Sequence, residues 1–392
     1  MRGRKSCEAC AKLFDKANWG SMTPFFQDLG EYSDLSTAAE RSQPLFPLAL
    51  PGPQTQERVR EVLNFAPGDE QPQDVQVLRR WEKDGVSGEE ITWSVGYGPR
   101  TYAWLLKPVG ASGKLPGVLA LHDHGGFKFY GKEKIADGPD DTPQVLHKFR
   151  AAYGNRAFAN ELARRGCAVL VPDVFLWGSR KFAFETIPKD KRYVAKKLLQ
   201  DEPYDLIEEY NHAASLHEEV VEKYCRVLGT CLAAVVSYED RVAANYLASL
   251  DDVGSIGCVG LSGGGARSGL LQATCDKIQA AVIVGMMSTY PGLLDHNIVT
   301  HTWMLFPESW ARYGDYPDLV ACRAPSPLLV QYDEDDPLFT LDGMRGADAR
   351  FQTLYKSTNQ PENYTGQFYP GTHKFDVPMQ EAAFDWLLKA LR

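Results

Sequence analysis

One serine in this chain lies in a sequence pattern that favours covalent chemistry. Gly260, Ser262 and Gly264 form Gly-x-Ser-x-Gly, directly after the apolar run 256–259 and before a helix-like segment. A strand–turn–helix corner of this kind presents the serine oxygen to a substrate, and its glycines leave room for neighbouring backbone. We therefore expect Ser262 to be a nucleophile, and the amide N–H of Gly263 to stabilise the oxyanion that forms. The alternative is a glycine-rich turn whose helix N-terminus binds an anion.

A group of acids and then a histidine follow the serine along the chain. Hydrolases with such a corner use this order of serine, acid and histidine. His373 precedes the last helix-like segment and is the expected general base. Four consecutive acids follow an apolar run, and one of their carboxylates is expected to orient the histidine. Alternation along the chain predicts that Asp333 and Asp335 face solvent or cap the turn. Pro337 would hold the side chain of Asp336 in one direction.

A second glycine-containing loop carries donors for the same oxyanion. The segment His122-Asp123-His124-Gly125-Gly126 follows another apolar run. We expect the backbone N–H of Gly125 or Gly126 to be the second oxyanion donor. His122, Asp123 and His124 also suggest a metal site, but alternation would turn the two histidines to opposite faces of a strand. No metal site and no cofactor is therefore predicted.

Three ring-bearing side chains are candidates for contact with a substrate. His124 lies in the loop just described, Trp177 in a segment rich in aromatic residues, and Trp303 after the fourth predicted buried strand. Such side chains suit a binding site because ligand pockets are lined mainly by apolar and aromatic groups. The alternative for Trp177 and Trp303 is simple packing against the sheet.

The elements that must position these residues alternate between apolar runs and helix-like segments. Two β-rich segments flank the turn Gly-Tyr-Gly-Pro-Arg and predict a hairpin. Short continuous apolar runs then predict strands that are buried on both faces of a sheet. The pattern indicates an α/β fold with a doubly wound, mostly parallel sheet and helices on both faces, whose active sites form at the carboxyl ends of strands. The predicted strands are 91–95, 101–108, 118–121, 167–174, 255–261, 277–285, 327–333 and 365–371, and the predicted helices are 155–165, 223–250 and 380–392.

The first part of the chain differs in composition from the rest. Residues 1–89 are rich in proline, glycine and charge, with helical patterns at 59–65 and 75–81. They are predicted to be an extension packed on the main domain. Residues 90–392 are predicted to form the catalytic domain, in which 174–222 is an insertion that caps the site.

Composition and charge exclude several classes of partner. The chain of 392 residues is 44% hydrophobic and 24% charged, which suffices for a packed core. Its net charge of −9 argues against nucleic acid or an anionic membrane as the main partner. No apolar run is long enough to cross a bilayer, and the N-terminus lacks the apolar core of a signal peptide, so a cytoplasmic location is predicted. Cys7 and Cys10 have C-x-x-C spacing, but no second pair completes a zinc site.

Five segments between residues 100 and 392 carry a resemblance to a known family: LALHDHGG, VLVPDVFLWGSR, GLSGGG, PLLVQYDEDDPLF and FYPGTHKF. They resemble α/β-hydrolases of the dienelactone hydrolase-like and acetyl xylan esterase-like group. In that group the acid is commonly the fourth residue of a Gly-x-x-Asp turn. Asp333 stands where the glycine would be, so the resemblance places the acid at Asp336. Dienelactone hydrolases themselves use a cysteine, so Ser262 implies esterase chemistry instead.

The resemblance implies a serine hydrolase that cleaves carboxylic esters through an acyl-enzyme intermediate. A deacetylase acting on carbohydrate or small-metabolite esters is one form of this prediction. Two alternatives stay open: a peptidase or amidase with the same fold, and a non-catalytic scaffold that binds a ligand or a protein. The expected partner is a small-molecule or carbohydrate ester, with no nucleic acid and no membrane, and self-association into a homo-oligomer stays open.

Overall fold

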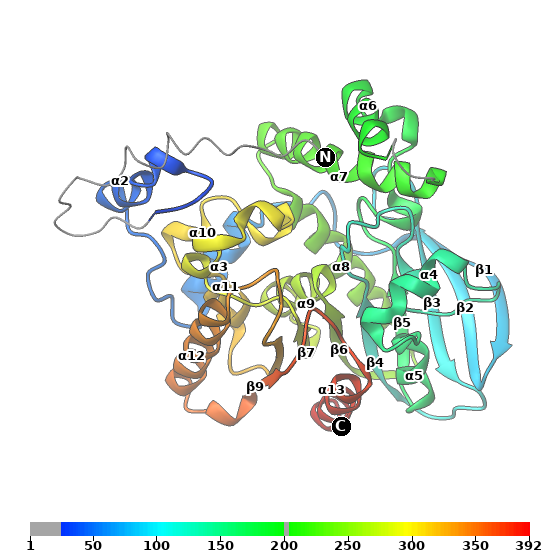
Figure 1. Ribbon diagram of the computed structural model, residues 1–392. Coiled ribbons are helices and arrows are strands. Elements are labelled where there is room, and N and C mark those ends of the chain that lie inside the picture. The colour runs from blue at the N-terminus through cyan, green and yellow to red at the C-terminus, as the bar shows by residue number, and fades with distance from the viewer. Residues whose placement is uncertain (1–24, 200–203) are drawn as a thin grey trace. The chain divides into compact units, whose positions relative to one another are not determined.

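The structure is a computed structural model that describes residues 25–199 and 204–392 (Figure 1). The C-x-x-C pair, Cys7 and Cys10, lies outside the described residues. The chain divides into two compact units, Met1–Pro44 and Leu45–Arg392. Every residue predicted to take part in chemistry belongs to the second unit.

The described part of the first unit is helical. A short 3-10 helix, η1 (Gly30–Tyr32), precedes the α-helix α2 (Leu35–Ser42). The hydroxyl of Ser33 donates to the carbonyl of Gly30 at 2.7 Å and so closes the turn between the two helices.

A nine-stranded sheet forms the centre of the second unit (Figure 1). Its strands lie in the order β1-β2-β3-β5-β4-β6-β7-β8-β9, with antiparallel pairing from β1 to β5 and parallel pairing from β5 to β9. The mostly parallel α/β sheet predicted from the alternating apolar runs is confirmed, and so is the hairpin, which is β2–β3. The strands are β1 (Gln73–Lys83), β2 (Val86–Ser94), β3 (Thr101–Pro108), β4 (Leu115–Leu121), β5 (Ala168–Pro172), β6 (Val253–Leu261), β7 (Ile278–Val284), β8 (Leu328–Asp333) and β9 (Tyr364–Tyr369).

The order of the strands creates a crevice between β4 and β6. The chain leaves β4 toward β5 on one side and leaves β6 toward β7 on the other, although β4 and β6 are direct neighbours. Loops that follow two such strands part to opposite faces of the sheet, and ligands bind where they part. The residues after Leu121 and after Leu261 therefore face one another across the expected position of a site.

Helices cover both faces of the sheet. The α-helices of the second unit are α3 (Pro53–Val62), α4 (Gln144–Phe149), α5 (Phe158–Arg164), α6 (Lys189–Leu198), α7 (Leu206–Val227), α8 (Leu232–Ala248), α9 (Gly263–Thr274), α10 (Tyr290–His296), α11 (Tyr316–Val320), α12 (Leu341–Ser357) and α13 (Val377–Ala390). None of the helices in the described residues is both long and apolar enough to span a membrane.

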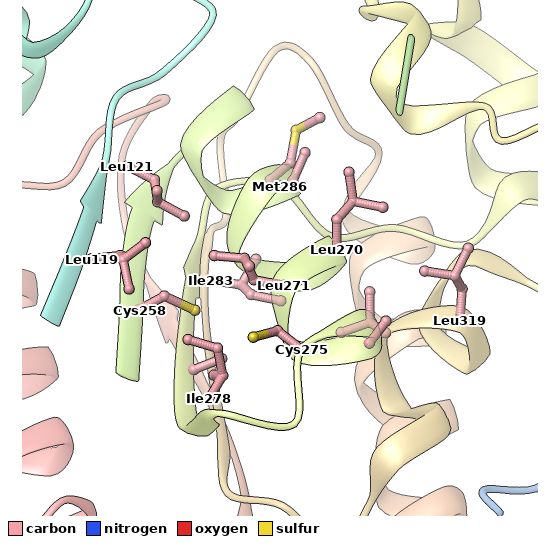
Figure 2. Packing of buried hydrophobic residues seen from close by; sticks show 14 of the residues in the cluster. Leu119, Leu121, Cys258, Leu270, Leu271, Cys275, Ile278, Ile283, Met286 and Leu319 are labelled. Atoms are coloured by element: carbon pink, nitrogen blue, oxygen red, sulfur yellow. The ribbon is translucent and has the colours of Figure 1, made fainter. Parts of the chain in front are cut away.

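Alternation along each strand divides the core between the two faces. Leu119 and Leu121 of β4 pack in the cluster that contains residues of α8 and α9, which Figure 2 shows in part. Val118 and Ala120 of the same strand pack in a second cluster, with residues of α5 and α13. Because both faces of the sheet are covered, the residues of β4 form a continuous apolar run. This run is the signal by which the strand is predicted from the sequence.

The helix predicted at 75–81 is wrong, because this segment lies in β1. Its apolar residues fit a helical spacing as well as a strand, and pairing with β2 decides between the two. Trp81 packs on Gly88 of β2, where a Cβ atom would lie 2.2 Å from the indole. The indole also meets Trp104 edge-on, with ring centroids 6.1 Å apart. The central sheet therefore begins within the residues predicted to be an extension.

The single long helix predicted at 223–250 is also wrong, because two helices share this segment. α7 ends at Val227 and α8 begins at Leu232. Gly229 between them has a φ of 76°, a left-handed conformation that ends helices and that glycine adopts without a steric penalty. Most of α7 lies in the segment predicted to cap the site.

A buried ion pair joins α9 to α8 beneath the crevice. The guanidinium of Arg267 donates to both carboxylate oxygens of Asp240, at 2.7 and 2.9 Å. It also donates to the carbonyl of His122 at 3.2 Å, in the loop after β4. Both side chains of the pair are 1% exposed. Arg267 therefore connects the two helices on one face of the sheet to the loop that borders the crevice.

We expect Arg267→Met to lower the free energy of unfolding by about 3–5 kcal/mol, because Asp240 would remain as an unpaired buried charge. Urea denaturation followed by circular dichroism measures the change. Arg58→Met is the control, since Arg58 pairs with Glu61 on the surface and its loss is expected to leave the urea midpoint unchanged. Equal midpoints for the two variants would contradict this prediction.

Candidate active site

Ser262 occupies the sharp turn between β6 and α9. Its φ of 57° and ψ of −125° lie outside the regions that residues with a side chain ordinarily adopt. The amide of Ser262 donates to the carbonyl of Val284 at 2.9 Å, which fixes the turn to the end of β7. The residue is half-buried, at the carboxyl end of the parallel strands. A strained serine in this position has the geometry that the sequence pattern predicts.

The glycines around Ser262 are required by close backbone contacts. A Cβ atom on Gly260 would lie 2.4 Å from the carbonyl carbon of Gly264. A Cβ atom on Gly264 would lie 2.1 Å from the carbonyl oxygen of Leu121, at the end of β4. Neither contact is compatible with a side chain. The turn itself therefore requires glycine at position 260, and the neighbouring strand β4 requires glycine at position 264.

The structure brings His373 and Asp336 together after β9 and β8. The Nδ1 atom of His373 lies 2.6 Å from Oδ2 of Asp336, and the other carboxylate oxygen accepts the amide of Leu338 at 2.9 Å. The side chain of Asp336 is fully buried, and that of His373 is 22% exposed. Burial lowers the pKa of His373, but the hydrogen bond and charge of Asp336 outweigh it, so the pKa lies above its ordinary value.

The imidazole of His373, which follows β9, reaches across to the end of β7, the strand next to the one that presents Ser262. Gly285 directly follows β7, and a Cβ atom placed on it would lie 3.2 Å from Cε1 of His373. The same position is 3.1 Å from Cδ1 of Leu261, the residue before the serine. The imidazole and the side chain of the residue before the serine therefore both lie close to Gly285.

The prediction that Asp333 faces solvent or caps the turn is wrong, whereas Asp335 does face solvent. Asp335 is exposed and accepts the amide of Gly371 at 3.0 Å. Asp333 ends β8, is fully buried, and accepts the amide of Lys374 at 3.0 Å through Oδ2. Burial raises the pKa of Asp333 to about 7. The strand continues to Asp333, so its side chain points into the sheet's packed face and not into the turn.

Asp333, Asp336 and His373 also form a compact group of donor atoms. One atom from each lies within 4.8 Å of the others, a spacing that a metal ion could bridge. The imidazole nitrogen nearest to the carboxylates is already hydrogen-bonded to Asp336. The His122, Asp123 and His124 cluster weighed from the sequence is not such a group, because its side chains go to different partners.

The amide that the loop after β4 places beside the serine turn is that of His124. The amides of Gly125 and Gly126 are the ones expected there from the sequence. A Cβ atom on Gly263 would lie 2.5 Å from the backbone nitrogen of His124. The amide of Gly126 donates to Nδ1 of the His124 ring at 3.0 Å, and Gly125 packs against the side chains of Asp123 and Phe149. The geometry therefore favours the N–H of His124 over those of Gly125 and Gly126 as the partner of Gly263.

Lys134 sets the direction of this amide. Its ammonium is fully buried and donates to the carbonyl of Asp123, with His124 and Phe127 carbonyls at 3.4 and 3.3 Å. In a trans peptide the C=O of one residue and the N–H of the next point in opposite directions. Since Lys134 holds the Asp123 oxygen on the buried side, the N–H of His124 points the other way, toward the crevice.

The three predicted substrate contacts lie at the same edge of the crevice but differ in exposure. His124 is 20% exposed at its side chain, Trp303 is 37% exposed, and Trp177 is 1% exposed. The Trp177 indole lies 5.1 Å from the His124 ring and donates to the His124 carbonyl at 3.3 Å. Trp177 is therefore buried behind the loop after β4, in a cluster with residues of α7 and α8 and not against the sheet, and Trp303 in η7 (Trp303–Leu305) is open to a ligand.

Sequence reasoning missed the charged residues that hold this loop in place: Glu218, Lys128, Lys134 and Arg267. Glu218 of α7 is 5% exposed and accepts from the ring of His124 at 2.8 Å. A signal for it exists, because Glu218 lies on the apolar stripe of α7, four residues after Ala214 and three before Val221. A charge on a buried stripe implies a buried partner.

Comparisons with known proteins identify the fold. No protein-family model matches the chain, and no curated protein matches it in sequence. Solved structures do match. A Bacteroides fragilis protein assigned provisionally as an acetyl xylan esterase has a TM-score of 0.64 and 15% identity, over 87% of this chain and 82% of its own. A glucuronoyl esterase from Solibacter usitatus has a TM-score of 0.60 and 14% identity, over 97% and 99%. Acetyl xylan esterase 1 from Thermoanaerobacterium sp. has a TM-score of 0.51 and 14% identity, over 91% and 98%. The α/β-hydrolase fold is confirmed by these likenesses.

We expect Asp336→Asn to lower kcat at least a hundredfold, because it removes the charge that orients the imidazole and stabilises its cation; the same change in a serine protease costs about 10⁴. Asp335→Asn, at the surface, and Asp333→Asn, which keeps an oxygen to accept the amide of Lys374, are each expected to lose less than tenfold. Steady-state kinetics on one ester measures all three. An active Asp336→Asn beside a crippled Asp333→Asn would transfer the role to Asp333.

The pH dependence of kcat/KM is expected to report the raised pKa of His373. The imidazole must be neutral to accept a proton, so the rate rises with pH through this pKa, with a midpoint above about 6.5. Besides Asp336, the carboxylates of Asp333 and Asp123 raise the pKa. Asp336→Asn removes one of these charges and should move the midpoint to lower pH. A profile that is flat from pH 5 to pH 8 would rule out a histidine base.

Proposed function

We propose that this α/β-hydrolase-fold chain is a serine esterase with Ser262 as nucleophile, His373 as general base and Asp336 as the orienting acid. The observation that carries the proposal is the 2.6 Å hydrogen bond between His373 and Asp336, in the loops after β9 and β8. The imidazole lies near Gly285 at the end of β7, the neighbour of the strand that leads into the strained turn of Ser262. A scaffold that only bound ligands would have no use for a buried acid–histidine pair beside a strained serine.

The proposed reaction has two stages. His373 takes the proton of Ser262 as the serine oxygen attacks the ester carbonyl, and Asp336 stabilises the resulting imidazolium. The N–H groups of Gly263 and His124 stabilise the oxyanion, and His373 then returns the proton to the departing alcohol. Water deacylates the serine in the second stage with the same groups. Two oriented amides matter because loss of one such donor typically costs about 10²–10³ in rate.

The proposed substrates are carboxylic esters of carbohydrates. The support comes from the names of two structural neighbours, an acetyl xylan esterase and a glucuronoyl esterase, and from the exposed face of Trp303 at the crevice. Fold alone does not decide a substrate. Acetylated xylo-oligosaccharides, methyl glucuronate esters and p-nitrophenyl esters, assayed beside p-nitroanilides, separate a deacetylase, a glucuronoyl esterase and an amidase.

We expect the chain to hydrolyse at least one of these esters and to react covalently with a fluorophosphonate probe. Ser262→Ala should lose both properties and keep its fold, since removing one hydroxyl from a half-buried position costs little stability. Mass spectrometry of the labelled peptide identifies the serine. More than a few per cent of wild-type turnover in a clean Ser262→Ala preparation would overturn the assignment.

The same assays, run after dialysis against EDTA, test for a metal. The proposed serine mechanism generates its own nucleophile, so turnover should survive chelation. If chelation abolishes turnover and zinc or calcium restores it, the Asp333, Asp336 and His373 group binds a metal and the mechanism must be rewritten.

A further inference from the structure

The helix α7 buries one carboxylate between the loop after β4 and the segment after β7 that carries Thr302 and Trp303. The Oε2 atom of Glu218 accepts from Nε2 of His124 at 2.8 Å and from the ammonium of Lys128, both in the loop after β4. Its Oε1 atom accepts from the hydroxyl of Thr302 at 2.7 Å and from the amide of Trp303 at 3.2 Å. Four donors from two loops therefore converge on a single side chain of the predicted insertion.

These contacts fix the ring of His124 in one tautomer. Nδ1 accepts the amide of Gly126 at 3.0 Å, so the proton of the neutral ring lies on Nε2 and is donated to Glu218. The ring thus binds the amide of Gly126 through Nδ1, which closes the turn from 124 to 126. Through Nε2 it binds Glu218 of α7. Trp177 donates to the His124 carbonyl at 3.3 Å and holds the following peptide as well.

The residue whose ring is held in this way, His124, also carries the backbone amide that lies beside Gly263. The peptide before it is oriented by Lys134, and the backbone nitrogen of His124 approaches the turn of the serine. We propose that Glu218 is a positioning residue, which acts through the His124 ring to hold the His124 amide in the oxyanion site. The inference rests on the proposed esterase function and adds that the insertion takes part in catalysis as well as in covering the site.

The charge of Glu218 suits this task. Burial raises its pKa, but Lys128 and His124 outweigh burial and hold the pKa well below the ordinary value for a glutamate. The carboxylate therefore accepts hydrogen bonds throughout the working range of pH. A neutral amide in its place would offer one acceptor oxygen and two donors to a position where four donors converge.

Glu218→Gln and Glu222→Gln form a matched pair of variants. Glu222 lies one turn further along α7, is 2% exposed, and accepts the amide of Leu232 at 2.8 Å, away from the loop after β4. Both substitutions remove a buried charge from one helix, so a general loss of stability would appear in both. The melting temperature of each variant is measured with its kinetics.

We expect Glu218→Gln to lower kcat and kcat/KM for an active ester by about 10- to 100-fold, with KM changed less than threefold. An oxyanion donor acts only in the transition state. Its displacement therefore lowers kcat and kcat/KM together and leaves KM almost unchanged. Phenylboronic acid, which forms a tetrahedral adduct with the serine, should bind more weakly by a similar factor. Glu222→Gln should keep wild-type kcat and wild-type affinity for the boronic acid.

Three outcomes would overturn the inference: equal kinetics for the two variants, a rise in KM alone, or unchanged affinity for the boronic acid. If Glu218→Gln does not fold, Glu218→Asp is measured in the same way, since it keeps the charge near Lys128 but withdraws the carboxylate by one methylene. An inactive wild-type chain that no fluorophosphonate labels would overturn the proposed function itself. An active wild type with an unaffected Glu218 variant would overturn only the positioning role.

Discussion

The crevice depends on one close contact between two stretches of backbone. The carbonyl oxygen of Leu121, at the end of β4, lies where a side chain on Gly264 would begin. Parallel neighbours whose connections part to opposite faces leave their carboxyl ends almost at the same point, and only glycine allows the two chains to come so close there. This contact brings the loop after β4 against the turn of Ser262. A side chain at Gly264 would separate the proposed nucleophile from the amide of His124.

Buried charges hold the loop after β4 because no ladder of backbone hydrogen bonds can. Lys134, Arg267 and Glu218 bind its carbonyls and one of its side chains. Burying such groups costs several kcal/mol each before their partners compensate, and apolar replacements are often as stable. Lys134 illustrates what such a charge does here, because it holds the carbonyl of Asp123 on the buried side and so turns the N–H of His124 the other way.

Environment separates the two carboxylates that lie near His373. Asp336 accepts hydrogen bonds from the imidazole through one carboxylate oxygen and from a backbone amide through the other. Asp333 is fully buried with one amide donor, and burial raises its pKa to about 7. Two carboxylates three residues apart thus have different surroundings, because one continues the strand and the other has entered the turn.

The sequence by itself determined the sheet, the elbow of Ser262 and the candidate members of the site, because each depends on local pattern. Buried parallel strands read as apolar runs, and the elbow needs glycines at fixed spacing. Local pattern could not assign β1, whose residues suit a helix until β2 pairs with them, nor the break between α7 and α8. Tertiary structure alone decided which amide faces Gly263, that Asp333 is buried, and that Glu218 reaches His124. Each of these depends on contacts between segments far apart in the chain, and neither composition nor periodicity encodes such contacts.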